Sequence, residues 1–184
     1  MKNIDNTLQL RDFDLIYGIG NVGRQDDGLG WAFIDALEEM PSVTATLVRN
    51  YQLFFEDVDL IRRHQRVLFV DATKKAETQQ FSMERVSPKF DDSFTSHAIS
   101  VQTIVAMCHK CYEAFPDVWL LTVKGEAWEL SLGLTPSASS NLEHTLTSVV
   151  TEGVKEIPSK QQLEPVSHVL RSAERPVLTR TQYE

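Results

Sequence analysis

Two adjacent aspartates follow a glycine-rich turn near the start of the chain. The stretch LIYGIGNVGRQDDGLG, residues 15–30, begins as a short apolar run and reaches Asp26 and Asp27 after the turn. Glycines let the backbone take conformations closed to other residues, so such a turn can hold side chains just beyond the end of a strand. In open α/β sheets, ligands usually bind at this edge. Both carboxylates are therefore candidate site residues.

Two further residues could join them. Asp71 closes the apolar run at residues 66–70, and His97 stands at the start of a predicted helix. If the strands before Asp27 and Asp71 are parallel neighbours, both carboxylates project at one edge of the sheet, where a packed helix can also bring His97. Two carboxylates and an imidazole suit a divalent transition metal that polarises an amide carbonyl or activates water.

Each of these residues also has a simpler interpretation. Asp27 could cap the following helix, where an acid suits the helix dipole. Asp71 could cap a turn, and His97 could merely begin a helix. The combination of Asp27, Asp71 and His97 at loop positions on one predicted edge is what favours a catalytic metal site, because pattern alone leaves each residue ambiguous.

The positions of the apolar residues predict alternating strands and helices. Strands are predicted at residues 13–19, 43–48, 66–70, 81–86 and 118–123, with a further short strand or edge extension at 128–132. Helices are predicted at residues 28–40, 53–63, 97–114 and 137–157, the third capped by Thr95 or Ser96. This order predicts an α/β fold, a single three-layer α/β/α domain with a mostly parallel twisted sheet, over residues 1–157. Residues 158–184 are polar and predict a flexible C-terminal tail.

Composition narrows the possible functions. The formal net charge is −8 and there is no basic block, so we expect no nucleic-acid partner. The first residues are polar and acidic, and no apolar run approaches the roughly 20 residues of a membrane helix, so we expect a cytoplasmic protein without a membrane partner. The only cysteines, Cys108 and Cys111, form a C-x-x-C pattern inside a predicted helix with no second pair, which favours a structural role.

A glycine pattern offers a different function. Gly18, Gly20 and Gly23 fit the G-x-G-x-x-G fingerprint of dinucleotide-binding domains. In that fingerprint the helix begins near the third glycine and holds the pyrophosphate, whereas here two carboxylates intervene and would repel it. Arg49, at the end of the second predicted strand, could still suit a 2′-phosphate. The pattern leaves a nucleotide-binding α/β oxidoreductase domain as an alternative.

Several segments together resemble the hydrogenase maturation proteases, the endopeptidases that process the large subunit of [NiFe] hydrogenases. GIGN followed by DDGLG resembles the family signature G-x-G-N-x-x-x-x-D-[DE]-G-x-G. QLFFE, VLFVDA, SFTSHAIS and LLTVKGEAWELSLGLTPSASSNL are similar to the family's later segments, in the same order, over about residues 14–154. Where many relatives have Thr-Pro after Gln-Leu, this chain has Phe54 and Phe55.

The resemblance implies a specific activity. The family's metal-contacting residues fall on Asp27, Asp71 and His97, and no separate cofactor-binding residue is implied. The nickel is implied to arrive with the hydrogenase large-subunit precursor, whose C-terminal peptide is then removed. The resemblance further implies a monomer. A non-catalytic hydrogenase-assembly chaperone that has kept the fold and lost cleavage is the other alternative.

Overall fold

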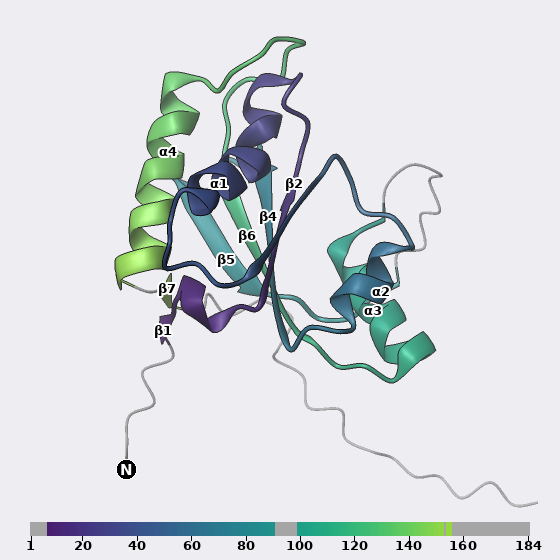
Figure 1. Cartoon of the computed structure of the whole chain (residues 1–184). Helices are drawn as coiled ribbons and strands as arrows, with labels where there is room; N and C mark the ends of the chain where they lie inside the picture. Colours follow the sequence, from purple (N-terminus) through teal and green to yellow (C-terminus); the bar gives the residue numbers. More distant parts are fainter. Residues whose placement is uncertain (1–6, 91–98, 153, 156–184) are drawn as a thin grey trace, which may run out of the picture.

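A five-stranded sheet forms the centre of the molecule. The computed structural model describes residues 7–90, 99–152, 154 and 155 (Figure 1). In sheet order, the strands are β3 (Thr46–Asn50), β2 (Leu15–Ile19), β4 (Arg66–Thr73), β6 (Asp117–Lys124) and β5 (Phe81–Arg85). The first four are parallel, and β5 pairs with β6 in the antiparallel sense. The prediction of a mostly parallel sheet is confirmed.

Helices cover both faces of this sheet, as Figure 1 shows. Helices α1 (Leu29–Glu38) and α4 (Pro136–Thr147) lie on one face, and α2 (Asp57–Ile61) and α3 (Val101–Tyr112) lie on the other. The strands supply both layers because successive side chains point to opposite faces. Ile16 packs in the core with α1 and α4, whereas its neighbours Leu15 and Tyr17 pack in the core with α2 and α3. The predicted three-layer α/β/α fold is therefore confirmed.

Several local predictions were wrong. The predicted strand at 128–132 is a loop, in which Ser131 forms only an isolated bridge with Arg24. Helix α3 has Ser100 as its N-cap, because the Ser100 Oγ accepts a hydrogen bond from the Thr103 N–H at 3.2 Å, so the cap was predicted too early. A small antiparallel sheet of β1 (Thr7–Leu8) and β7 (Val154–Lys155) was not predicted. The short helices η1 (Leu10–Asp12) and η2 (Gln25–Gly28) were also missed. The helix predicted at 137–157 is α4, followed directly by the short helix η3 (Ser148–Glu152), and it ends before β7.

Two of the sequence-based predictions fall outside the described residues. These are the predicted flexible tail, residues 158–184, and the candidate ligand His97. Within the part that is described, no helix combines the length and the apolar character needed to cross a bilayer.

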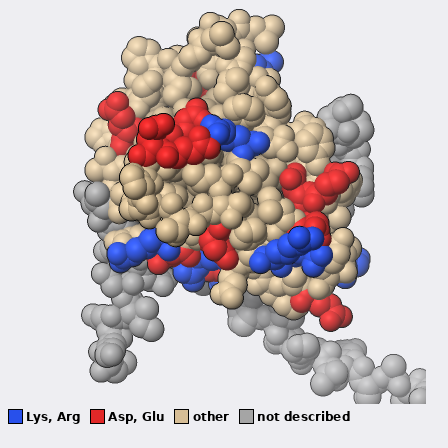
Figure 2. Space-filling model, in the orientation of Figure 1, with Lys and Arg blue, Asp and Glu red and all other residues tan. Residues whose placement is uncertain are grey.

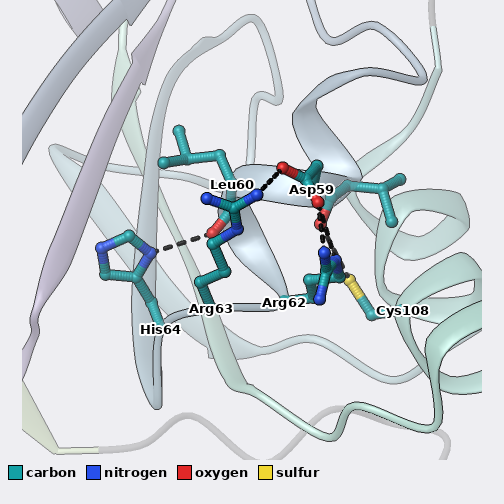
Figure 3. A network of polar contacts seen from close by, with 7 residues as sticks. Asp59, Leu60, Arg62, Arg63, His64 and Cys108 are labelled. Carbon is teal, nitrogen blue, oxygen red and sulfur yellow. Dashed lines mark hydrogen bonds and ion pairs between the residues drawn. The ribbon is translucent and has the colours of Figure 1, made fainter.

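Polar contacts occur within the segment of the short helix α2, and one contact joins α2 to α3 (Figure 3). The Cys108 thiol on α3 lies 4.0 Å from the Val58 carbonyl oxygen, to which it donates. Arg62 Nε donates to Asp59 Oδ1 at 2.9 Å, and Arg63 also pairs with Asp59. Burial raises the pKa of Cys108 to about 11, so its thiol is protonated at neutral pH. This agrees with a structural role for Cys108.

Helix α1 packs unusually close to the strands before it. A Cβ added at Gly30 would lie 2.1 Å from the Ile19 carbonyl oxygen and 2.6 Å from that of Val70. A Cβ at Gly18 would lie 2.3 Å from the Gly30 carbonyl oxygen. Both glycines are therefore needed because backbone meets backbone between β2, β4 and α1.

We expect Gly30→Ala to lower the free energy of unfolding by about 3 kcal/mol, because the added methyl group forces two strands away from the helix. Urea denaturation at pH 7 measures this. Gly23→Ala is the matched control, since a Cβ there would meet only the Asn21 side chain, at 3.1 Å. Equal stability of the two variants would contradict the close-packing argument.

Candidate functional site

The glycine-rich turn folds back on itself and so places Asp27. Gly20 has φ +144°, and a Cβ at this position would lie 1.8 Å from the Asp27 carbonyl oxygen. That same oxygen accepts a hydrogen bond from the Asn21 N–H at 3.1 Å. The chain can make this turn because glycine tolerates the positive φ and leaves room for the backbone of Asp27. Asp27 is thereby held beside the carboxyl end of β2.

Asp26 has a different role from its neighbour. Its side chain is fully buried and accepts four hydrogen bonds from the loop that follows β6. Oδ2 accepts from the Glu126 N–H at 2.8 Å, the Ala127 N–H at 2.9 Å and the Thr135 hydroxyl at 2.9 Å. Oδ1 accepts from the Thr135 N–H at 2.7 Å. Asp26 therefore ties the turn to residues 126–135 and is not available to a ligand.

The electrostatics of Asp26 follow from these donors. Burial by itself would raise its pKa, but the backbone hydrogen bonds from Thr135, Ala127 and Glu126, with that from the Thr135 hydroxyl, outweigh burial and lower the pKa. Hydrogen bonds to an ionised carboxylate favour the charged form. Asp26 is thus a buried anion whose charge is satisfied within the protein.

Asp27 and Asp71 line the same cleft at the carboxyl ends of the parallel strands. Asp71 lies within β4, which extends to Thr73, so the prediction that it follows the strand was slightly wrong. The cleft has a volume of about 430 Å³. Its other lining residues come from the end of β2, the segment after β3, the start of α3, and β6: Ile19, Gly20, Tyr51, Gln52, Leu53, Ile99, Ser100, Val101, Gln102 and Leu120. The predicted meeting of these two carboxylates at one sheet edge is observed.

The cleft environment changes the proton affinity of Asp71. Burial raises its pKa to about 6, and the charge of Asp27 adds to this effect, while the Ala72 N–H, 2.7 Å from Asp71 Oδ1, partly opposes it. An ionised carboxylate that accepts few hydrogen bonds is stabilised when a cation approaches. The pair could therefore bind a cation or hold a proton near neutral pH.

The third predicted residue, His97, lies outside the described residues, so its role stays a prediction. Among the residues that the structure describes, no group of three His, Cys, Asp or Glu side chains could hold a metal ion. In the described part of the chain, Asp27 and Asp71 are therefore two candidate ligands without a third.

Tyr51 is a cleft residue that sequence reasoning missed. It stands directly after β3 and has no periodic pattern around it, so only the parallel pairing of β2 with β3 brings it beside Asp27. The start of α3 also lines the cleft, at the sheet edge where this helix was expected from the sequence to begin. The sequence did hold one indication of this side of the cleft. Gln52 and Leu53, which line it, belong to the segment QLFFE that resembles a segment of the protease family.

The glycine pattern has a packing explanation in place of nucleotide binding. A Cβ at Gly28, the N-cap of α1, would lie 3.2 Å from the Val22 Cα, so the turn itself covers the start of the helix. Arg49, a candidate for a 2′-phosphate, pairs instead with Asp35 and Glu38 on α1. On the face drawn in Figure 2, Lys and Arg side chains form small separate groups. A dinucleotide site is not favoured.

Comparisons with known proteins agree with this architecture. No protein-family model and no curated protein matches the sequence. Among solved structures, the hydrogenase maturating endopeptidase HybD from E. coli is 19% identical, with 73% of this chain and 88% of that chain covered and a TM-score of 0.60. The [NiFe] hydrogenase maturation protease HycI from Thermococcus kodakarensis is 20% identical, with 73% and 88% covered and a TM-score of 0.55. A hydrogenase 3 maturation protease is 18% identical, with 79% and 97% covered and a TM-score of 0.60. These similarities establish a shared fold.

We expect Asp26→Asn to lower the free energy of unfolding by about 2–3 kcal/mol at pH 7, because it leaves at least one buried donor without an acceptor. The folded-state pKa of Asp26 is lowered, so its contribution is present above the ordinary aspartate pKa and is lost as the pH falls through the lowered value. Urea denaturation at pH 7 and pH 3 measures both effects. Asp35→Asn, which removes one partner of an exposed ion pair, is the control and should cost under about 1 kcal/mol. Equal losses would contradict the buried-anchor role.

Asp71→Asn should have the opposite effect on stability. The folded-state pKa of Asp71 is raised to about 6, so its favourable contribution is present below the unfolded-state pKa and is lost as the pH rises through about 6. In metal-free buffer, the variant should match the wild type at pH 4 and be roughly 1–2 kcal/mol more stable at pH 8. Thermal and urea unfolding across this range measure the difference. A constant difference at every pH would disprove the raised pKa.

Proposed function

We propose that this protein is an endopeptidase that removes a C-terminal peptide from the nickel-loaded precursor of a [NiFe] hydrogenase large subunit. The observation that carries the proposal is the meeting of Asp27 and Asp71 in one cleft, on a fold shared with hydrogenase maturation proteases. The motif resemblance found in the sequence supports the same activity independently of the fold.

In this proposal, the nickel is part of the substrate. It enters the cleft bound to the precursor, and Asp27, Asp71 and His97 contact it from the side of the protease. Carboxylates and imidazole are suitable ligands for a divalent transition ion, and an incomplete ligand set suits an ion that must leave again with the product. A cation also favours ionised Asp71 over its protonated form. Cleavage would therefore depend on metal loading of the precursor.

The protein's own residues position the two reacting partners. The rigid turn at Gly20 holds Asp27, and strand β4 holds Asp71, so the approaching nickel meets carboxylates that need no rearrangement. Positioning of this kind lowers the barrier because the entropy of bringing groups together is lost on binding. The scissile amide would lie beside the nickel in the same cleft.

We also infer that the protein acts as a cytoplasmic monomer without nucleic-acid or membrane partners. The net charge of −8 and the absence of any basic block in the sequence support the inference on nucleic acid. The lack of an apolar run of about 20 residues in the sequence supports the inference on location and membranes. The monomer rests on the sequence resemblance.

The direct test is incubation with nickel-loaded large-subunit precursor, followed by a gel mobility shift and mass spectrometry of the released peptide. The wild type should cleave, and Asp27→Asn, Asp71→Asn and His97→Ala should each slow single-turnover cleavage by about 100-fold or more. Asp35→Asn, which changes an exposed acid outside the cleft, is the control and should cleave at the wild-type rate.

Three results would contradict the proposal. Intact precursor after incubation with the wild type, accompanied by stable binding, would favour an assembly chaperone. Micromolar affinity for a dinucleotide would favour an oxidoreductase domain. Equal cleavage of nickel-loaded and nickel-free precursor would remove the metal from the mechanism.

A further inference from the structure

Three aromatic side chains are exposed on the segment between β3 and α2. Tyr51 is 55% exposed, Phe54 is 43% exposed and Phe55 is 53% exposed. We call these three residues the aromatic loop. Single exposed apolar side chains are common on protein surfaces, but several together on one short segment indicate an interaction site.

The aromatic loop is exposed although its backbone is held firmly. The Asp57 carboxylate accepts a hydrogen bond from the Phe54 N–H at 2.7 Å and another from the Tyr17 hydroxyl at 2.9 Å. Tyr17 in turn accepts from the Asn50 side-chain amide at 3.1 Å. Leu53, in the middle of the segment, is buried with 3% exposure. The segment is thus anchored from both ends and from its centre.

The tyrosine of the loop is fixed as well. Its ring contacts that of Trp31 with centroids 5.0 Å apart, and the Trp31 indole N–H donates to the Asn50 carbonyl oxygen at 3.0 Å. Aromatic side chains on a rigid backbone lose little conformational freedom on binding, which makes them effective anchors for a partner.

The aromatic loop is continuous with the candidate active site. Tyr51 lines the cleft that contains Asp27 and Asp71, and Phe54 and Phe55 follow it within four positions. A peptide whose reacting amide lies beside the two acids can therefore contact Tyr51, and through it the rest of the loop, with its neighbouring residues. Phe54 and Phe55 do not line the cleft themselves, but their segment contributes Tyr51, Gln52 and Leu53 to it. Leu130 and Leu132 are also highly exposed, but their segment contributes no residue to this cleft.

Charge indicates which kind of segment fits there. Glu56, directly after Phe55, is exposed, and the cleft itself presents Asp27 and Asp71. These acids disfavour an acidic partner, since like charges brought together without compensation oppose binding. On the face of the molecule drawn in Figure 2, charged side chains occur in separate groups with uncharged surface between them.

We propose that the aromatic loop binds an apolar, non-acidic segment of the hydrogenase large-subunit precursor next to the scissile bond, and so contributes to choice of substrate. This inference rests on the proposed function. The loop adds affinity for the precursor and takes no part in bond cleavage. Removal of the aromatic side chains is therefore expected to raise KM and to leave kcat unchanged.

The test is the kinetics of precursor cleavage by the double variant Phe54→Ala/Phe55→Ala. KM should rise about tenfold or more while kcat stays within about twofold of the wild type. The variant Phe54→Leu/Phe55→Leu keeps the apolar surface and should restore KM to within about threefold. Phe115→Ala is the matched control, because Phe115 is 72% exposed and precedes β6, at the sheet edge opposite the cleft.

The outcomes separate this inference from the proposed function. If the wild type cleaves and the double alanine variant has an unchanged KM, the aromatic loop has no such role while the protease function stands. A loss of kcat in the leucine variant would also overturn the inference. If the wild type leaves the precursor intact, both proposals fail. Thermal unfolding of each variant shows that it is folded, and Phe55→Ala alone, with an expected rise in KM of about threefold or more, replaces any double variant that does not fold.

Discussion

The four hydrogen bonds to the buried carboxylate of Asp26 are the interaction on which the site depends. They join the turn after β2 to a loop about one hundred residues later in the chain. Without these donors the carboxylate could not be buried as an anion, because burying an unpaired charge costs several kcal/mol. With them, it fixes the turn, and the next residue, Asp27, is left to face the cleft. One aspartate holds the turn in place, and its neighbour lines the cleft.

Three aspartates near this edge show how environment decides the behaviour of one residue type. Asp26 is fully buried and Asp71 is partly buried in the cleft, yet the pKa of Asp26 is lowered and that of Asp71 is raised. The difference lies in the donors, since Asp26 accepts four hydrogen bonds from its surroundings and Asp71 accepts one from the Ala72 N–H and faces Asp27. A carboxylate that lacks internal partners is the one that benefits from an incoming cation. This contrast favours Asp71 over Asp26 as a candidate ligand for a cation in the cleft.

Close backbone packing explains Gly18 and Gly20, two of the three glycines that fit the dinucleotide fingerprint. Gly18 and Gly30 let α1 approach β2 and β4, and Gly20 lets the turn close on Asp27. A phosphate-binding loop uses glycines to admit a ligand, whereas here backbone of the same protein occupies that space. In both cases the absence of a Cβ makes room, but here the room is filled by the protein's own backbone and not by a phosphate. The rigid segment at Tyr51, anchored by Asp57 and Trp31, completes the other side of the cleft.

The sequence by itself determined the layers of the fold and the two acids at its edge. Apolar runs of strand length alternated with helical spacing, and the residues after two such runs, Asp27 and Asp71, had to meet if the strands were parallel. Boundaries were less well predicted, as the start of α3 at Val101 shows, because a cap depends on which local hydroxyl actually bonds the helix. Only the tertiary structure decided that Asp26 is buried and that Tyr51 borders the cleft. Their partners are distant in the chain, and no local pattern reports a hydrogen bond or a ring contact formed by folding.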